Sequence, residues 1–248
     1  MKKLFTITVF ITALLSYSFA SDEKPKLTIY YFHRPPYYVR TDDKPQGFIM
    51  ILTRKVLEKA GIEAEFREIP PKRILHELTK PQPACSPGWF KTPKREKLYL
   101  FSTVIYQNAP LTFVARKSED NGRTRISLDE MLFFLRASRH PGLICGFSYG
   151  PFLDALFSSE RTTKCLSTRV LNVLKMVAEG RADFAILSPE ELGYLISHYP
   201  DLKESLAIIS IEGIPEGNRR YIMCSKGVPS HVMESINEAI RAIVPWID

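Results

Sequence analysis

The chain has 248 residues, of which 45% are hydrophobic and 25% are charged, and its formal net charge is +7. This composition excludes a disordered, fibrous or low-complexity protein, and it is sufficient for one large domain or two smaller ones. The basic residues are scattered and form no stripe interleaved with aromatic residues. We therefore interpret them as solvated surface charge and expect no nucleic-acid partner.

Residues 1–20 have the pattern of a secretory signal peptide. A short basic start precedes an apolar stretch over residues 4–15, and small residues follow at Ser18 and Ala20. We therefore expect cleavage before Ser21 and export to the periplasm. The apolar stretch is too short to span a bilayer comfortably, and no cysteine follows it closely enough for a lipoprotein anchor.

The first half of the remaining chain alternates between predicted strands and helices. Apolar residues recur at helical spacing between Ile49 and Ala60, and Gly61 follows as a stop signal. Runs rich in β-branched and aromatic residues, or alternating between apolar and polar residues, indicate strands. We expect strands over residues 27–32, 62–69, 98–102 and 111–117, and helices over residues 49–60 and 73–79.

The second half repeats this alternation. Ser127 and Glu130 form a predicted capping box, and Ser188 followed by Pro189 marks a second helix start. We expect strands over residues 142–147, 182–187 and 221–224, and helices over residues 169–179, 189–198 and from residue 230 onward. Two such halves predict parallel sheets covered by helices, with the ligand site in the cleft between them.

Four cysteines occur in the chain, at positions Cys85, Cys145, Cys165 and Cys224. They form no C-x-x-C pair and have no metal-ligand spacing. An even number of cysteines in an exported protein indicates disulfides, and three pairings are open. The alternative is four buried free thiols, because cysteine also packs as a small hydrophobic residue.

The stretch "SPGWFKTPKRE" has the features of an anion-binding segment. Thr92 and Pro93 are typical of a helix start, whose free amides favour a negative charge. Arg95 carries a planar fork suited to a carboxylate or phosphate, and Gly88 allows a backbone amide to approach a ligand closely. The alternative is an ordinary helix start without a ligand.

The order of these segments resembles the bacterial extracellular solute-binding proteins of family 3, type II periplasmic binding proteins that capture polar amino acids for import. The resemblance covers nearly the whole exported chain. It implies an α/β fold of two lobes, each with a mostly parallel sheet flanked by helices. The motifs that carry it are "RPPYYV", "DDKPQGFIMILTRKVLEKAGIEAEF", "TPKREKLYLFS", "GFSYG" and "VAEGRADFAIL".

The resemblance also implies how the chain divides. Lobe 1 is expected to comprise residues 21–109 plus 212–248, with the C-terminal helix packed on it, and lobe 2 residues 110–211. The chain then leaves lobe 1 near residues 106–110 and returns near residues 212–217. Under this topology, the expected disulfides are Cys85 with Cys224 and Cys145 with Cys165.

Site residues follow from the same resemblance. Arg95 matches the family's carboxylate-binding arginine, which implies a clamp completed by the amide of Gly88, with Trp89 or Phe90 as an apolar wall. Tyr37 matches a ligand-stacking aromatic residue, and Tyr149 is its expected counterpart in the other lobe. Packing in the core or at the hinge is the alternative for these aromatic residues.

Two positions depart from the family pattern. Arg34 stands where many members have an aromatic residue, and Ser188 stands where they have the aspartate that binds the ligand ammonium. An α-amino acid would therefore lose its main partner unless Glu190 or Glu191 replaces it, so we expect an acidic or aromatic carboxylate instead. Arg34 either faces the cleft or is a solvated loop residue.

The sequence predicts binding without catalysis. Its five histidines are dispersed, and no hydrolase, zinc-protease or phosphate-loop motif is present. We expect a monomer without a cofactor that binds a small molecule and delivers it to an ABC permease. A sensor or scavenger that acts through a separate membrane protein is the alternative, and a small-molecule lyase on the same fold is a third.

Overall fold

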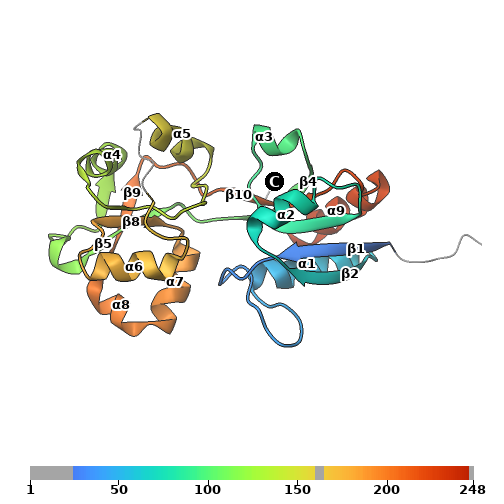
Figure 1. Ribbon diagram of the computed structural model, residues 1–248, viewed down its shortest axis with the longest axis horizontal. Helices are drawn as coiled ribbons and strands as arrows, with labels where there is room; N and C mark the ends of the chain where they lie inside the picture. Colours follow the sequence, from blue (N-terminus) through green and yellow to red (C-terminus); the bar gives the residue numbers. More distant parts are fainter. Residues whose placement is uncertain (1–24, 160–164, 246–248) are drawn as a thin grey trace, which may run out of the picture.

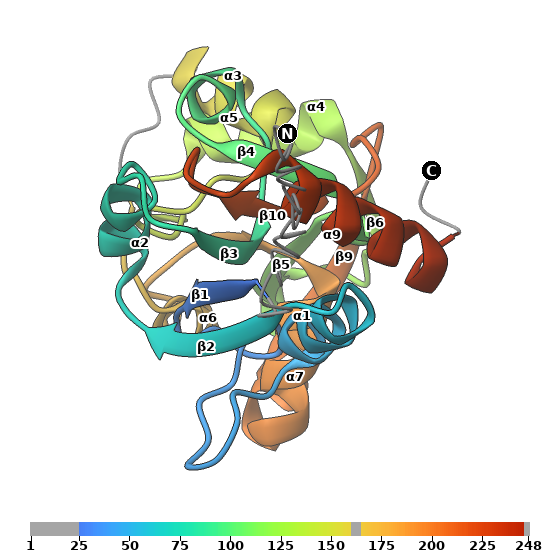
Figure 2. The ribbon, with the colours of Figure 1, turned by 90° about the vertical axis from the view of Figure 1, so that its right-hand side faces the viewer.

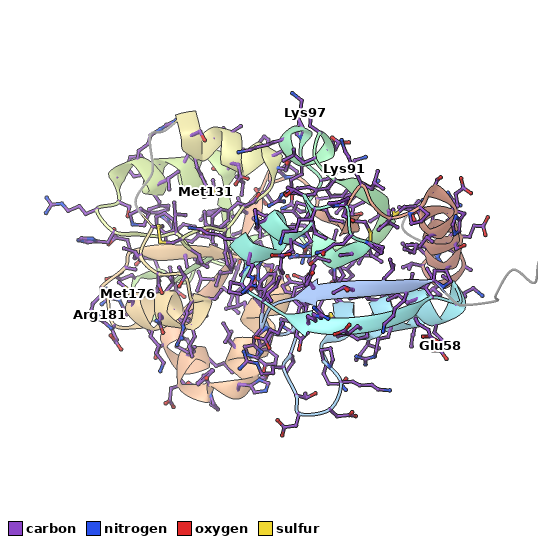
Figure 3. The ribbon with its side chains drawn as sticks, turned by 45° about the vertical axis from the view of Figure 1, so that its right-hand side comes forward. Glu58, Lys91, Lys97, Met131, Met176 and Arg181 are labelled. Carbon is purple, nitrogen blue, oxygen red and sulfur yellow. A yellow bond between two sulfur atoms is a disulfide. The ribbon has the colours of Figure 1, made fainter. Side chains whose placement is uncertain are left out.

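The computed structural model describes residues 25–159 and 165–245, and the predicted signal peptide lies outside them. The chain forms two lobes that lie side by side, each built on one five-stranded sheet (Figure 1). No helix within the described ranges is long and apolar enough to cross a membrane. Charged side chains such as Glu58 and Arg181 project from the surface, whereas Met131 is buried (Figure 3).

Lobe 1 contains the sheet with strand order β2-β1-β3-β10-β4. Strand β10 is antiparallel to both of its neighbours, whereas β2, β1 and β3 are parallel to one another. The strands are β1 (Lys26–Tyr31), β2 (Glu63–Glu68), β3 (Ala84–Trp89), β4 (Leu100–Gln107) and β10 (Arg219–Cys224). The helices are α1 (Phe48–Lys59), α2 (Pro71–Glu77), α3 (Pro93–Glu96) and α9 (Ser230–Ile243).

Helices cover both faces of the lobe 1 sheet. Viewed from the outer end of this lobe, α1 and α9 lie on one face and α2 lies on the other (Figure 2). Helix α9 buries Val232, Ile236 and Ile240, which recur every four residues and therefore share one side of the helix. The expected packing of the C-terminal helix on lobe 1 is thus present.

Lobe 2 contains the sheet with strand order β6-β9-β5-β8-β7. Strand β5 is antiparallel to β8 and β9, and the outer pairs are parallel. Its strands are β5 (Thr112–Arg116), β6 (Arg125–Ser127), β7 (Pro141–Gly142), β8 (Phe184–Leu187) and β9 (Leu206–Glu212). Its helices are η1 (Lys117–Glu119), α4 (Leu128–Ala137), α5 (Pro151–Ser159), α6 (Val170–Ala178), α7 (Pro189–His198) and α8 (Pro200–Ser205).

The lobe 2 sheet is also covered on both faces. Helices α4 and α5 pack on one face, and α6, α7 and α8 pack on the other. All four residues of β8 are buried, as expected for a strand with helices on either side. The predicted capping box is present, because the Ser127 hydroxyl accepts from the amide of Glu130 and the Glu130 carboxylate accepts from the amide of Ser127.

Two short connections join the lobes, through residues 108–111 and 213–218. They lie against each other, because the amide of Asn108 donates to the carbonyl of Asn218 at 3.1 Å. A Cβ atom at Gly217 would lie 1.8 Å from the carbonyl oxygen of Asn108, so this close approach requires glycine. The lobe boundaries at residues 109 and 212 remain our proposal.

Both disulfides are the pairs that the expected topology predicts. Cys85 and Cys224 join β3 to β10 within lobe 1, with an S–S distance of 2.05 Å. Cys145 and Cys165 are joined within lobe 2. The described chain contains no free cysteine.

Four strands and two α-helices differ from the sequence predictions. Strand β3 was missed because a proline is unusual within a central strand; this proline, Pro87, lies where the register with β10 shifts. The strand expected over residues 142–147 ends at Gly142, because the chain turns and the amide of Leu143 bonds to the carbonyl of Pro141. Strands β6 and β9 and helices α5 and α8 were also absent from the prediction.

Candidate functional site

A pocket lies between the two lobes and beside both connections. Its cavity volume is about 20 Å³, room for about one water molecule, so the lobes must separate to admit a larger ligand. Lobe 1 contributes Phe90, lobe 2 contributes Phe147, and the two connections contribute Asn108 and Asn218. The charged side chains that line it are Arg34, Arg220 and Glu191. Since two of these are cations and one is an anion, one positive charge in the pocket wall has no counter-charge there.

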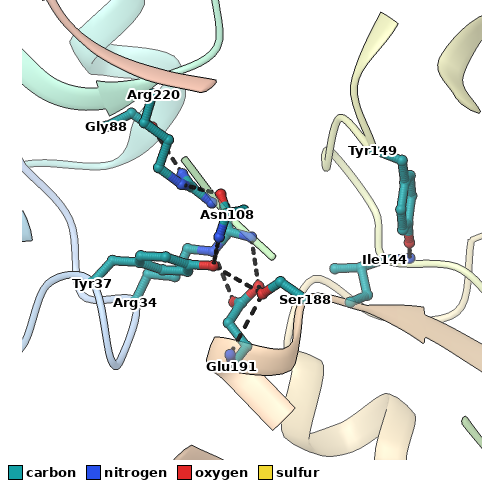
Figure 4. A network of polar contacts seen from close by, with 9 residues as sticks. All are labelled: Arg34, Tyr37, Gly88, Asn108, Ile144, Tyr149, Ser188, Glu191 and Arg220. Carbon is teal, nitrogen blue, oxygen red and sulfur yellow. Dashed lines mark hydrogen bonds and ion pairs between the residues drawn. The ribbon is translucent and has the colours of Figure 1, made fainter. Parts of the chain in front are cut away.

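A chain of hydrogen bonds crosses from lobe 1 to lobe 2 beside this pocket (Figure 4). Arg220 Nε donates to Asn108 Oδ1 at 2.6 Å, and Asn108 Nδ2 donates to the Tyr37 hydroxyl at 2.8 Å. That hydroxyl lies 2.8 Å from Ser188 Oγ, which donates to Glu191 Oε2 at 3.3 Å. The predicted residues Tyr37 and Ser188 are therefore in direct contact across the lobes.

Arg34 forms an ion pair with Glu191 on the opposite lobe. Its Nε and Nη2 atoms donate to the two carboxylate oxygens, each at 2.8 Å. The guanidinium also lies 3.9 Å from the ring centre of Phe147. Burial disfavours the charge on Arg34, but the charge and hydrogen bonds of Glu191 outweigh it and raise the pKa of Arg34. Arg34 thus lines the pocket and is not a solvated loop residue.

Tyr37 and Tyr38 are both buried, and neither is among the residues that line the pocket. The Tyr38 hydroxyl donates to the carbonyl of Pro87 at 2.9 Å. A Cβ atom at Gly88, whose φ is +78°, would lie 1.7 Å from the Tyr38 hydroxyl. Gly88 is therefore needed for Tyr38 to pack, a reason that the sequence reasoning did not identify.

Arg95 is not among the residues that line the pocket. Its Nη1 atom donates to the carbonyl of Phe90 at 2.8 Å, and its guanidinium lies 4.9 Å from the ring centre of Trp89. Burial lowers the pKa of Arg95, and the nearby Tyr99 and Asp154 only partly oppose this. Arg95 therefore carries a partly buried charge, and it has no ion-pair partner in the described part of the chain.

The helix start at Thr92 is present but short. The Thr92 hydroxyl accepts from the amide of Arg95 at 3.3 Å, and α3 ends at Glu96. Trp89 donates through Nε1 to the Ser86 hydroxyl at 2.7 Å and does not line the pocket. The clamp residues expected from the sequence thus lie on the lobe 1 side, next to Phe90 rather than within the pocket wall.

Tyr149 lines the pocket from lobe 2. Its hydroxyl accepts from the amide of Ile144 at 2.9 Å, and its carbonyl accepts from the side chain of Asn218. Burial raises the pKa of Tyr149 to about 12. Tyr149 therefore links the pocket wall to the returning connection.

Sequence reasoning missed Arg220, which is only 4% exposed. Its Nη1 atom donates to the carbonyl of Gly88 at 2.8 Å, and its guanidinium lies 4.1 Å from the ring centre of Tyr37 and 4.8 Å from that of Phe90. The signal in the sequence was an arginine directly before the strand predicted over residues 221–224, close to the point where the chain was expected to return to lobe 1. Arg219 carries the same signal but is exposed, so the sequence did not distinguish the two.

The described residues contain no cluster of histidine, cysteine, aspartate or glutamate side chains that could hold a metal ion. The pocket wall instead combines guanidinium groups with aromatic rings and amides. Such a wall can bind a polar or anionic small molecule through hydrogen bonds and stacking.

A family model for bacterial extracellular solute-binding proteins, family 3, matches residues 28–244. The chain belongs to this family. The resemblance found in the sequence motifs is thereby confirmed, and with it the two-lobed α/β fold. A search among curated proteins found no match.

Solved structures of the same fold are similar over most of their length. An ancestral arginine-binding protein bound to arginine is 19% identical, with a TM-score of 0.68 over 90% of this chain and 94% of that one. A histidine kinase sensor domain with similarity to periplasmic binding proteins is 18% identical, with a TM-score of 0.68 over 90% of each chain. The Bordetella pertussis BvgS VFT2 domain is 14% identical, with a TM-score of 0.66 over 88% and 87%. At these identities the likeness establishes the fold alone.

Proposed function

We propose that this solute-binding protein captures a small solute bearing a carboxylate in the pocket between its lobes. The observation that carries the proposal is the position of two arginines beside Phe90. Arg95 bonds to the carbonyl of Phe90, Arg220 lies over its ring, and neither has an ion-pair partner among the described residues. A buried cation is costly without a counter-charge, so an anionic ligand would offset that cost.

Arg95 and Gly88 do not line the pocket in this structure, so the carboxylate contacts Arg95 and the amide of Gly88 only when the lobes have moved to widen the pocket toward them. Trp89 supports Arg95 from behind, through the contact between its ring and the guanidinium. The planar guanidinium of Arg95 can donate to both oxygens of a carboxylate. This two-point contact is why arginine is preferred to lysine at such sites. This role for Arg95 rests on its match to the family's carboxylate-binding arginine.

The rest of the pocket wall shapes the remainder of the ligand. Tyr149 contributes an aromatic surface from lobe 2, and Tyr37 fixes Ser188. Arg34 and Ser188 replace the aromatic residue and the aspartate of the family pattern. A ligand with an acidic or aromatic carboxylate fits this wall better than an α-amino acid does.

The protein acts in the periplasm as a monomer and delivers its ligand to an ABC permease. A sensor role is the second candidate, which is favoured by the likeness to a histidine kinase sensor domain and to the BvgS VFT2 domain. In either role, closure of the lobes around the ligand presents a new surface to a membrane partner. A permease that requires this protein for uptake would support the first role, and a kinase that requires it for signalling would support the second.

A thermal-shift screen tests the binding function. The purified protein is screened against amino acids, dicarboxylates, aromatic acids and sugar acids, in parallel with Arg95→Ala and the exposed neighbour Lys94→Ala. A ligand at about 100 times its dissociation constant stabilises the native state by roughly 2.7 kcal/mol. We expect one class of acid to stabilise the wild type and Lys94→Ala but not Arg95→Ala. If Arg95→Ala responds like the wild type, the clamp role of Arg95 is wrong.

A further inference from the structure

We infer that the pocket selects carboxylic acids that lack an ammonium group. Within the pocket wall itself, Arg220 is the residue that binds the anion. This inference rests on the proposed function and narrows it to a substrate class. Two features carry it: the acidic side chain in the pocket wall is already paired with Arg34, and the guanidinium of Arg220 has N–H donors without a partner among the described residues. The first excludes a cationic group, and the second favours an anionic one.

Glu191 is the acidic side chain that lines the pocket. Its Oε1 and Oε2 atoms accept two hydrogen bonds from Arg34 and one from Ser188. Its side chain is 4% exposed. A ligand ammonium would have to displace Arg34 to reach this carboxylate, and would then leave a guanidinium unpaired in the same wall.

Glu190 does not replace it. Its Oε1 atom accepts from the hydroxyl of Tyr106 and from the amide of Ala109, and its Oε2 atom is buried without a hydrogen-bond partner among the described residues. Glu190 is not part of the pocket wall, so an ammonium group in this pocket would meet no free carboxylate among the described residues that line it. Such a group is strongly disfavoured relative to water.

Arg220 offers the opposite environment. Of the five N–H donors that a guanidinium carries, Nε donates to Asn108 and Nη1 to the carbonyl of Gly88. Both acceptors are neutral, so the charge of Arg220 is not balanced by them. The rings of Tyr37 and Phe90 hold the guanidinium in place. A carboxylate that binds the remaining donors meets a fixed fork and loses little entropy in ordering it.

Asn108 provides a way to neutralise this charge without removing Arg220. Its Oδ1 atom accepts from Arg220 Nε at 2.6 Å, so Asn108→Asp places a carboxylate at the same point with almost no change in shape, and the Tyr37 hydroxyl then has to donate to Asp where it now accepts from Asn108 Nδ2. Asn108→Asp and Arg220→Gln change the net charge of the pocket by the same amount. Arg219→Gln makes the same change at an exposed site and is the matched control.

Isothermal titration calorimetry on matched acids tests the inference. The probes are succinate with aspartate, glutarate with glutamate, and phenylpropionate with phenylalanine, together with the amino counterpart of any acid found in the screen. We expect the acid in a binding pair to bind at least about tenfold more tightly than its amino counterpart, because the ammonium is desolvated without a partner. We expect Arg220→Gln and Asn108→Asp to weaken binding by about tenfold to a hundredfold, the range for a hydrogen bond to a charged group, and Arg219→Gln to leave it unchanged.

Different failures point to different parts of the reasoning. If an amino acid binds as tightly as its deaminated partner, the exclusion of an ammonium group is wrong while carboxylate binding stands. If Arg220→Gln and Asn108→Asp bind like Arg219→Gln, Arg220 is not the anion-binding residue. If Arg220→Gln does not fold, Asn108→Asp alone decides this point. If no carboxylate in the screen binds the wild type, the proposed function itself is overturned.

Discussion

The ion pair between Arg34 and Glu191 is expected to be a principal contact that holds the two lobes together. Two opposite charges about 4 Å apart attract by roughly 4 kcal/mol at the effective dielectric near a protein surface. Removing one partner of a buried pair costs about 3–5 kcal/mol, because the other charge is left unpaired. The Arg34 side chain is 21% exposed, so we expect the lower end of this range, about 3 kcal/mol, for Glu191→Gln.

Urea and thermal unfolding measure this loss. In a chain of this size, 1 kcal/mol shifts the melting temperature by about 2–4 °C, so Glu191→Gln is expected to melt roughly 6–12 °C below the wild type. The matched control is Glu212→Gln, which breaks the pair between Arg125 on β6 and Glu212 on the neighbouring strand β9. That pair also has a 2.8 Å contact, but both side chains are more than half exposed, so its loss is expected to cost at most about 1 kcal/mol.

Opening of the lobes could relieve part of the cost, because Arg34 would then return to water. Small-angle X-ray scattering detects this as a larger radius of gyration for Glu191→Gln than for the control. We therefore expect a lower melting temperature, an expanded molecule, or both. If Glu191→Gln matches Glu212→Gln in both measurements, the pair does not hold the lobes together.

Two further predictions concern the disulfides and the buried phenol. The Cys85–Cys224 disulfide closes a separation of 139 residues and Cys145–Cys165 one of 20, so loop entropy predicts losses of about 5 and about 3 kcal/mol when each pair is replaced by alanine. Urea unfolding checks this order, and the reverse order would contradict it. The pKa of Tyr149 is raised to about 12, so its contribution, up to roughly 3 kcal/mol, is present below pH 10 and is lost as the pH rises toward 12. An absorbance titration should show one tyrosine fewer that ionises near pH 12 in Tyr149→Phe than in the wild type. An unchanged titration curve would show that Tyr149 does not have the raised pKa.

Features that depend on neighbouring residues were predictable from the sequence. The helix at Pro189–His198 begins where Ser188 and Pro189 place it, because a cap and a proline act on the first turn alone. The capping box at Ser127 and the buried strand at Phe184–Leu187 follow in the same way. The family motifs then supplied the topology that pairs the four cysteines correctly.

Features that depend on contacts between distant residues were not predictable. Strand β3 contains Pro87, which disfavours a strand locally, yet it is paired on both sides with β1 and β10. Its formation depends on tertiary pairing, which local propensity does not report. The strand expected over residues 142–147 failed for the converse reason, since a β-rich sequence there is turned by local bonds after Gly142.

The sequence by itself therefore determined the capped helix starts, the family and the absence of the usual aspartate at Ser188. The tertiary structure decided what the charged residues do. Arg34 meets Glu191 across a separation of 157 residues, and Arg220 meets Asn108 across 112. Strand alternation alone cannot say whether Arg219 or Arg220 points inward, because a shift of one residue exchanges the two faces. The charge of the pocket is a sum over such distant contacts, which is why it became visible only in the folded chain.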